Sequence, residues 1–294
     1  MENDAWIKER EEITQKKVDR WNNEILVLVS AYSGQLMFLK ACLESVKSIG
    51  WILLMYDNPS RRFDTHMPTP EMFGLVDQFF MKEPTSEIPG PAYPQFWQFR
   101  HGCDILLGSE APYIFVIGGD SVLEKPEGIV EIIKMLEQEK GDIISCSTRN
   151  EKHGKPFVGS KSFLVKKLAF FKIVNFLEKG FVPLDHQYGS FENRMGLAVQ
   201  ETGVKEVKTP ENPSEDQFAH DYDSDSNCIN HGTWGKILGY RHLAGEHKIR
   251  KMKKQKPIEQ KYFDTKHLRK QDLDTMVKYW ETGDFKYVER WWET

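Results

Sequence analysis

Three stretches of consecutive apolar residues stand out in the first half of the chain, at residues 25–29, 51–56 and 113–117. Such continuous runs are typical of strands that are buried on both faces of a parallel sheet. Between the first two runs, residues 36–46 carry apolar side chains at helical spacing. Two parallel strands joined by a helix form a right-handed crossover, so the pattern predicts an α/β unit at the start of the fold.

Weaker patterns predict the remaining elements. Gly50 follows the first helical segment and is interpreted as the glycine just past its C-terminus. We expect an α/β fold with a mixed, mainly parallel sheet flanked by helices and a helical C-terminal extension. The domains are a helical arm at 1–24, the α/β domain at 25–245 and the extension at 246–294. Further strands are expected within 75–81 and 143–147, and helices over 95–107, 126–139, 163–176, 191–202 and 272–292.

Polar and turn-forming residues follow each predicted strand. The first strand is followed by residues 30–34, the second by Asp57 and the third by Gly118, Gly119 and Asp120. In open α/β sheets, ligands bind outside the carboxyl ends of the strands. We therefore expect these three segments to lie on one edge of the sheet, around a ligand.

The composition is that of an ordinary globular protein. The chain has 294 residues, a net charge of -4 and 29% charged residues, and its length suits one large or two small domains. Its four cysteines form no CxxC pair, which indicates free thiols in a reducing compartment. The N-terminus lacks a secretory pattern, and no apolar stretch approaches the roughly 18 residues of a membrane helix. We therefore expect a cytoplasmic protein.

Charge is distributed unevenly along the sequence. Residues 236–270 contain twelve Lys or Arg but only three Asp or Glu. A basic face of this kind suits an anionic ligand or partner. The alternative is a solvated lysine-rich surface that is balanced by acidic neighbours in the fold.

The order and spacing of these motifs resemble a known family. Residues 25–33, 38–46 and 52–58 resemble the opening of GT-A-fold glycosyltransferases, particularly the family-2-like group, and the third strand ends where that family has its DxD motif. The resemblance covers residues 25–125. It implies a GT-A, Rossmann-like fold and an enzyme that moves a sugar from a nucleotide-sugar of the UDP or GDP class to an acceptor hydroxyl.

The resemblance also implies roles for individual residues at the donor site. The loop after the first strand would border the nucleotide base, and Asp57 would accept a hydrogen bond from the base or the ribose. Two residues of the helix before the third strand match positions near the nucleotide. The implied nucleotide-binding residues are Ser30, Ala31, Tyr32, Asp57, Arg100 and Asp104.

For a metal, the resemblance implies that Asp120, as the last residue of the DxD-like motif, holds Mn²⁺ or Mg²⁺ against the diphosphate. Gly118 replaces the first aspartate, and a hard divalent cation prefers several oxygen ligands. Of three histidines between positions 231 and 247, we expect His231 or His247 to complete the site. Lys248 is the alternative, as a cation that neutralises the diphosphate. Otherwise Asp120 is a turn aspartate.

For the catalytic base of an inverting reaction, the sequence offers two carboxylates. Residues 191–193 resemble the family's acidic motif, but Asn193 replaces the usual aspartate and cannot accept a proton. Glu192 is therefore the first candidate and Asp185 the second. Alternatively, Glu192 is an acidic residue that favours a helix N-terminus.

Two other functions remain open from the sequence. Gly118 and Asn193 favour a catalytically degenerate protein that binds a nucleotide or a glycan. The basic segment and the late tryptophans, Trp280, Trp291 and Trp292, favour a glycosyltransferase that acts on nucleic acid, because phosphate neutralisation and base stacking use these residue types. More often, such tryptophans belong to a core or to a homo-oligomer contact.

Overall fold

The computed structural model describes most of the α/β domain and part of the C-terminal extension. The described residues are 12, 15–16, 18–32, 35–57, 67–82, 93–146, 151–152, 155–156, 158–159, 162–179, 191–207, 232–244, 258–264 and 270–287.

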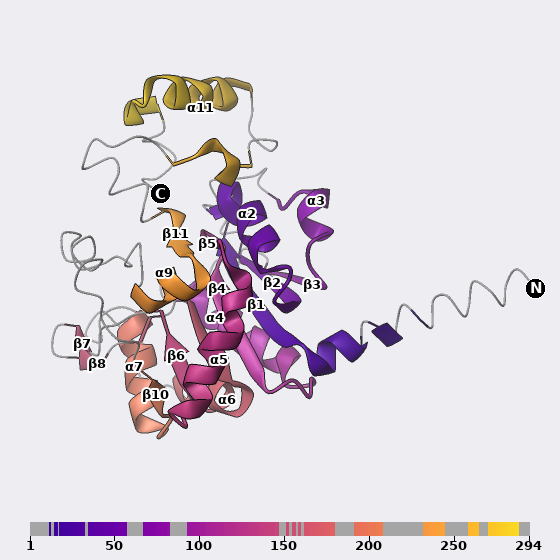
Figure 1. The fold of residues 1–294 in the computed structure, drawn as a ribbon, viewed down its shortest axis with the longest axis vertical. Helices are drawn as coiled ribbons and strands as arrows, with labels where there is room; N and C mark the ends of the chain where they lie inside the picture. Colours follow the sequence, from indigo (N-terminus) through magenta and orange to yellow (C-terminus); the bar gives the residue numbers. More distant parts are fainter. Residues whose placement is uncertain are drawn as a thin grey trace, which may run out of the picture.

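A seven-stranded mixed sheet forms the centre of the fold (Figure 1). Its order is β10-β6-β9-β4-β1-β2-β3, and β9 is antiparallel to both of its neighbours while the other pairs are parallel. Two small antiparallel sheets accompany it, β5 with β11 and β7 with β8. The strands are β1 Ile25–Tyr32, β2 Gly50–Asp57, β3 Gln78–Lys82, β4 Tyr113–Gly118, β5 Ser121–Leu123, β6 Ile143–Ser145, β7 Glu151–Lys152, β8 Lys155–Pro156, β9 Ser162–Lys166, β10 Glu206–Val207 and β11 Tyr240–His242.

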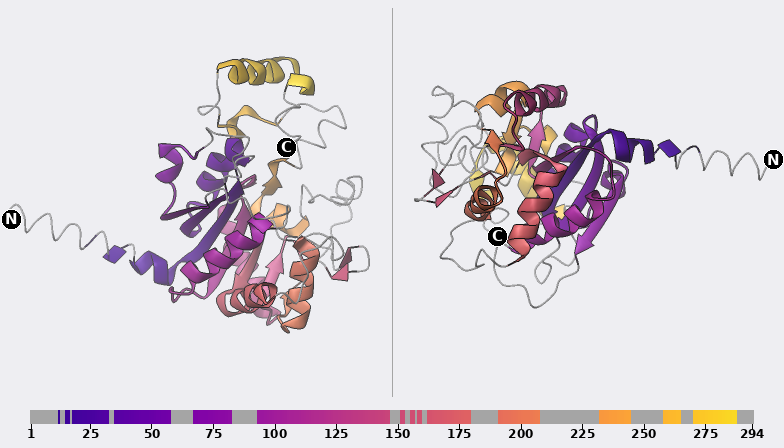
Figure 2. Two further views of the ribbon diagram at one scale, coloured as in Figure 1. Left: turned by 180° about the vertical axis from the view of Figure 1, so that it is seen from behind. Right: turned by 90° about the horizontal axis from the view of Figure 1, so that it is seen from below.

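Helices cover both faces of the large sheet. The α-helices are α2 Leu36–Val46, α3 Pro70–Phe73, α4 Tyr93–Leu106, α5 Ile129–Gln138, α6 Lys167–Glu178, α7 Phe191–Glu201, α9 Gly232–Leu238 and α11 Lys270–Thr282, and the short 3₁₀ helices are η2 Pro126–Gly128, η4 Gln260–Tyr262 and η5 Phe285–Tyr287. Viewed from behind, α4 crosses the face of the sheet that lies away from α5 (Figure 2).

Alternate residues of each strand enter two separate cores. On β1, Leu28 packs on the side of α4, α6 and α7, whereas Val27 packs on the side of α2, α5 and α9. Both side chains are completely buried. Because both faces are covered, every position of the strand must be apolar, and this explains the continuous runs in the sequence.

The predicted fold class is confirmed: the sheet is mixed and mainly parallel, helices flank it, and α11 lies in the C-terminal extension. The strands predicted at 25–29, 51–56 and 113–117 form β1, β2 and β4. The helix predicted over 191–202 is α7, and Gly203 beyond it has the left-handed φ of 66° that favours glycine.

Three element predictions were wrong in part. Residues 162–166 form the strand β9, so the helix predicted from 163 begins only at Lys167; a short apolar run fits a buried strand and a buried helix equally well. Gly50 is the first residue of β2, opposite Ile25, rather than a helix cap. The segment beginning at Pro126 opens with one 3₁₀ turn before α5. The elements α9 and β11 were not predicted.

A third apolar cluster joins the C-terminal extension to α2. Phe38 of α2 packs against Phe263, with ring centroids 5.1 Å apart, and the backbone N–H of Asp264 donates to the carbonyl oxygen of Met37 over 2.8 Å. Trp280 of α11 packs against the other side of this cluster, 5.3 Å from Phe263. Trp280 therefore packs within the chain, as the core alternative expects. Trp291 and Trp292 lie outside the described residues.

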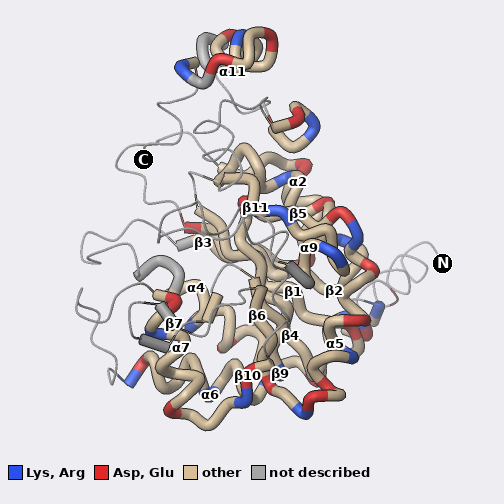
Figure 3. The backbone as a smooth tube through the Cα atoms, turned by 60° about the vertical axis from the view of Figure 1, so that its left-hand side comes forward, with Lys and Arg blue, Asp and Glu red and all other residues tan. Residues whose placement is uncertain are grey.

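The expectations about cysteines, membrane helices and charge can be compared with the structure. Three of the four cysteines, Cys42, Cys103 and Cys146, are buried free thiols, and Cys228 lies outside the described residues. Within the described ranges, no helix has the length and apolar composition needed to cross a membrane. Charged residues of both signs lie along α5, α6 and α11 (Figure 3). Most of the basic segment 236–270 falls outside the described ranges.

Candidate functional site

The strand order reverses at β1, which lies between β2 and β4. The chain builds β1, β2 and β3 toward one edge and then returns to place β4 on the other side of β1. At the carboxyl end, Tyr32 lies opposite Asp57 and Ser30 lies opposite Gly118. The three segments predicted to share an edge therefore do so. In open α/β sheets the crevice outside such a reversal is the usual place for a ligand.

Gln98 of α4 forms hydrogen bonds to the carboxyl ends of both β1 and β2. Its side chain is only 3% exposed. Its Nε2 donates to the carbonyl oxygens of Ala31, at 2.7 Å, and Met55, at 3.2 Å, while its Oε1 accepts from the hydroxyl of Ser30. The sequence analysis missed Gln98, because Gln95 and His101 are its neighbours at helical spacing and no apolar face marks it.

The turn after β4 packs directly against β1. The N–H of Gly119 donates to the carbonyl oxygen of Ser30 over 2.9 Å. A Cβ atom at position 119 would lie 2.6 Å from the Cβ of Ala31, which is closer than two non-bonded carbon atoms approach in proteins. Glycine is therefore required immediately before Asp120, and this close contact holds Asp120 beside the end of β1.

Asp120 pairs with a histidine that is distant in sequence. The Nε2 of His242 lies 3.0 Å from the Oδ2 of Asp120, and each side chain is 4% exposed. The pairing follows from the small sheet, in which β11 lies antiparallel to β5 with His242 opposite Ser121. The backbone N–H of Leu243 also donates to the carbonyl oxygen of Asp120 over 2.8 Å. A carboxylate and an imidazole therefore lie just beyond the strand reversal.

This pair fits a divalent metal as a partial ligand set. It offers one carboxylate and one imidazole, and the Nδ1 atom of His242 is buried without a hydrogen-bond partner among the described residues. Within those residues, no group of three His, Cys, Asp or Glu side chains could enclose an ion. A cation held here would therefore need further oxygen ligands from a bound ligand and water, as Mg²⁺ commonly does.

The last residues of β1 and β2 carry an aromatic ring and a carboxylate. The side chain of Tyr32 is 40% exposed, and its backbone N–H donates to Gln35 Oε1 over 3.3 Å. Asp57, in the opposite register position, is 5% exposed. Burial and the neighbouring Asp57 raise the pKa of Tyr56, so its phenol stays protonated. The ring of Tyr32 and the carboxylate of Asp57 therefore end two neighbouring strands.

Two of the predicted nucleotide-binding residues are engaged elsewhere. Arg100 forms ion pairs with Asp104 on its own helix and with Glu178 of α6, where its Nε lies 2.8 Å from Oε1. These contacts raise the pKa of Arg100, first through the hydrogen bond to Glu178. The ion pair between Arg100 and Glu178 therefore links α4 to α6. That Arg100 and Asp104 lie near a nucleotide stays a prediction.

The first candidate base begins α7. Glu192 is half-buried, and its carbonyl oxygen accepts from the N–H of Val158 over 3.1 Å. The preceding residue, Phe191, packs against Phe99 of α4 at 5.4 Å, one residue beyond Gln98. The start of α7 is therefore anchored on the helix that fastens the strand ends. The other predicted residues, Asp185, His231, His247 and Lys248, lie outside the described residues.

A polar cluster fastens the C-terminal extension beside the Asp120–His242 pair. Tyr262 of η4 donates its hydroxyl to Glu124 Oε1 over 2.7 Å, and Arg241 of β11 reaches both Glu124 and the hydroxyl of Tyr262. The guanidinium also lies over the ring of Tyr262, 4.6 Å from its centroid. The hydrogen bond from Tyr262, followed by Arg241, lowers the pKa of Glu124. No sequence motif indicated this cluster.

Comparison with known proteins gives a likeness of structure rather than of sequence. No protein-family model and no curated protein matches the chain. Among solved structures, the fold is similar to that of the mannosyltransferase PcManGT from Pyrobaculum calidifontis, in complex with GDP-Man and Mn²⁺, with a TM-score of 0.39 and 12% sequence identity. The alignment covers 64% of this chain and 55% of that one, so this chain spans about half of the length of that enzyme.

Proposed function

We propose that the protein is a glycosyltransferase of the GT-A type, related to the family-2-like group, that takes a UDP- or GDP-sugar as donor. The observation that carries the proposal is the Asp120–His242 pair, buried just beyond the reversal of strand order. With a divalent cation between them, a carboxylate and an imidazole at that position suit the diphosphate of a nucleotide-sugar. The sequence resemblance over residues 25–125 supports the same function.

In this proposal, the nucleoside lies at the ends of β1 and β2. Asp57 accepts a hydrogen bond from the ribose or the base, and the exposed ring of Tyr32 offers a surface for stacking. Gln98 does not contact the nucleoside in this scheme. It holds the backbone of Ala31 and Met55 so that the binding groups keep their spacing.

The diphosphate would lie toward Asp120 and His242, which would hold Mn²⁺ or Mg²⁺ together with it. When bound, such an ion supplies positive charge to the departing diphosphate, where negative charge develops in the transition state. The protein's own part is to keep the carboxylate and the imidazole in one place, through β5, β11 and the close packing at Gly119. His231, His247 and Lys248 remain candidates for additional contacts.

The acceptor hydroxyl requires a base if the reaction inverts the sugar. Glu192 at the start of α7 is the proposed base and Asp185 the alternative. A general base must come within about 2.6–3.2 Å of its proton, directly or through one water. Its anchoring through Phe191 and Phe99 gives Glu192 a fixed position on the face of the sheet that α4 covers.

The deciding experiment is a thermal-shift screen of UDP, GDP and their sugars with and without Mn²⁺, followed by donor turnover. A ligand at a hundredfold excess over its dissociation constant stabilises the folded protein by about 2.7 kcal/mol. We expect one nucleotide class to raise the melting temperature, more so with Mn²⁺, and the matching sugar donor to be hydrolysed slowly without acceptor.

Two outcomes would redirect the proposal. Nucleotide binding without hydrolysis or transfer would favour the catalytically degenerate binding protein instead. No stabilisation by any nucleotide would contradict the donor site itself. A matched control is Glu44→Gln, because Glu44 is exposed on α2 and belongs to no part of the proposed site.

A further inference from the structure

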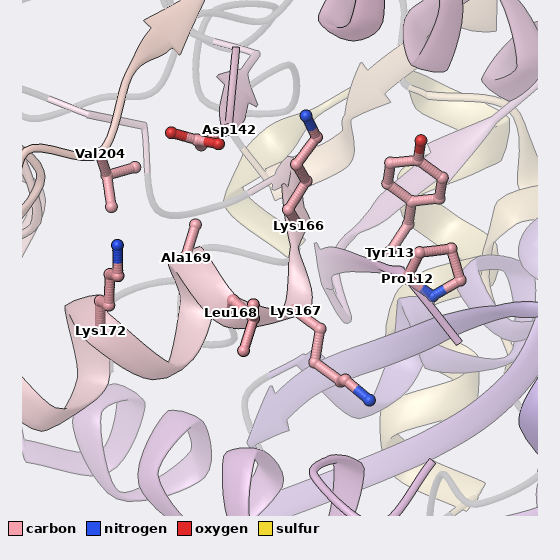
Figure 4. A pocket seen from close by; sticks show the side chains of 9 residues that line it. All are labelled: Pro112, Tyr113, Asp142, Lys166, Lys167, Leu168, Ala169, Lys172 and Val204. Atoms are coloured by element: carbon pink, nitrogen blue, oxygen red, sulfur yellow. The ribbon is translucent and has the colours of Figure 1, made fainter. Parts of the chain in front are cut away.

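A cavity lies at the opposite ends of the strands from the proposed donor site. Tyr113, the first residue of β4, lies opposite Lys166, the last residue of the antiparallel β9. Asp142 directly precedes β6, and Val204 lies shortly before β10. These residues, with the start of α6, line a cavity of about 450 Å³ (Figure 4). The cavity therefore opens at the amino ends of the parallel strands, with the sheet between it and Asp120.

The backbone around this cavity is held by hydrogen bonds between its own elements. The N–H of Lys166 donates to the carbonyl oxygen of Asp142, and the N–H of Lys167 donates to that of Pro112, at 2.8 and 2.9 Å. The carboxylate of Asp142 in turn accepts the backbone N–H of Lys205 at 3.0 Å. The cavity is therefore built from fixed segments of β9, α6 and the strand-leading turns.

The lining carries charged side chains, of which Lys172 is the cation left to meet a ligand. Three of the nine lining residues are lysines and one, Asp142, is acidic. Lys166 forms an ion pair with Glu137 at 3.1 Å, and Lys167 donates to the carbonyl oxygen of Ser109. Among the described residues, no hydrogen bond or ion pair engages Lys172, whose side chain is exposed. Figure 4 shows Lys166 and Lys172 on either side of Ala169.

The rest of the lining is apolar. Ala169 and Val204 are buried, and Leu168 is 71% exposed although it is a large aliphatic residue at the rim. Small-molecule sites typically have 300–1,000 Å³, a mainly apolar lining and a few placed polar groups. Lysine binds phosphate as a point charge. A ligand that satisfies both parts of the lining carries an anionic group and an apolar body.

We propose that this cavity binds a small amphiphilic anion, such as a phosphate monoester with an alkyl or aryl group. The anion pairs with Lys172, and the apolar body covers Leu168 and Val204. The same chemistry occurs in a free metabolite and in the headgroup region of an anionic lipid. The site is separate from the donor site and does not depend on the proposed sugar transfer.

The experiment is titration calorimetry of the full chain with octyl phosphate. Inorganic phosphate and octanol, which each carry one half of that ligand, are titrated separately for comparison. We expect saturable binding of one octyl phosphate and much weaker binding of either half. Lys172→Gln should weaken octyl phosphate binding about tenfold or more, since it removes a charge-assisted contact. Leu168→Asn should weaken it as well, because it removes apolar contact at the rim.

Two exposed positions outside the cavity serve as matched controls. Lys179 is exposed at the other end of α6, and Val130 is exposed on α5, and neither lines the cavity. Lys179→Gln and Val130→Asn should leave the affinity unchanged. Since all four positions are exposed, the variants are expected to fold, which their melting temperatures will verify.

The source of the ligand is distinguished by vesicles of phosphatidylcholine with and without phosphatidic acid. Flotation with the phosphatidic acid vesicles that is lost in Lys172→Gln supports a lipid source. Octyl phosphate binding without flotation supports a soluble one. The proposal is overturned if octyl phosphate does not saturate the protein, if Lys172→Gln binds it as the native protein does, or if a nucleoside diphosphate displaces it.

Discussion

Asp120 and His242 form a buried pair, 3.0 Å between Oδ2 and Nε2, although 122 residues separate them along the chain. The pair joins the end of the central strand β4 to β11, the strand at which the chain turns toward its C-terminal extension. The proposed diphosphate site therefore depends on a contact between the middle of the α/β domain and its C-terminal end.

The first prediction concerns metal dependence at this pair. Mn²⁺ should tighten the binding of the nucleoside diphosphate to the native protein, and Asp120→Asn should abolish the effect because the amide carries no negative charge. Titration calorimetry with and without Mn²⁺ measures both. If Mn²⁺ makes no difference to the native protein, Lys248 becomes the better candidate for neutralising the diphosphate. Asp284→Asn, an exposed aspartate near α11, is the control.

Asp57 gives the second prediction. Asp57→Ala should weaken nucleoside diphosphate binding about ten- to a hundredfold, because a hydrogen bond to a charged group contributes about 1.5–3 kcal/mol. The effect should appear with and without Mn²⁺, which separates it from that of Asp120. An unchanged dissociation constant in calorimetry would remove Asp57 from the site. Glu44→Gln serves as the exposed control.

Gln98 gives a prediction about stability. Gln98→Met keeps the length of the side chain but leaves the carbonyl oxygens of Ala31 and Met55 without their donor. Each buried group left without a partner costs about 1–3 kcal/mol, so the urea midpoint should fall clearly. Gln200→Met, at an exposed position of α7, should change it little. Equal midpoints for Gln98→Met and the native protein would contradict the fastening role.

Much of the fold could be predicted because local patterns of apolar residues determine its main strands. Burial on both faces makes β1, β2 and β4 continuous apolar runs, and parallel pairing places their carboxyl ends together. The same reasoning failed at β9, since its three apolar residues, 163–165, do not distinguish a strand from a helix turn. It also could not select His242 among three histidines, because the selection depends on β11 pairing with β5, a contact between distant segments.

The fastening of the C-terminal extension should depend on pH. The folded protein holds the pKa of Glu124 below its ordinary value, chiefly through the hydrogen bond from Tyr262. The contact therefore stabilises the fold fully above the ordinary glutamate pKa of about 4.3, and this stabilisation is lost as the pH falls through the lower folded value. Glu124→Gln should lower the urea midpoint at neutral pH and lose less stability on acidification. Parallel curves for both proteins would contradict this.

The last prediction concerns Glu192, the proposed base. Glu192→Gln keeps the shape of the side chain but removes its basic oxygen. General base catalysis typically contributes about 10²–10⁴-fold, so transfer should fall by that order while donor affinity stays nearly unchanged. This combination marks an interaction used in the transition state rather than in binding. Glu201→Gln, on an exposed position of the same helix, should transfer at the native rate. Full transfer activity in Glu192→Gln would exclude Glu192 and make Asp185→Asn the next variant; if that variant is also fully active, a retaining mechanism or another base follows.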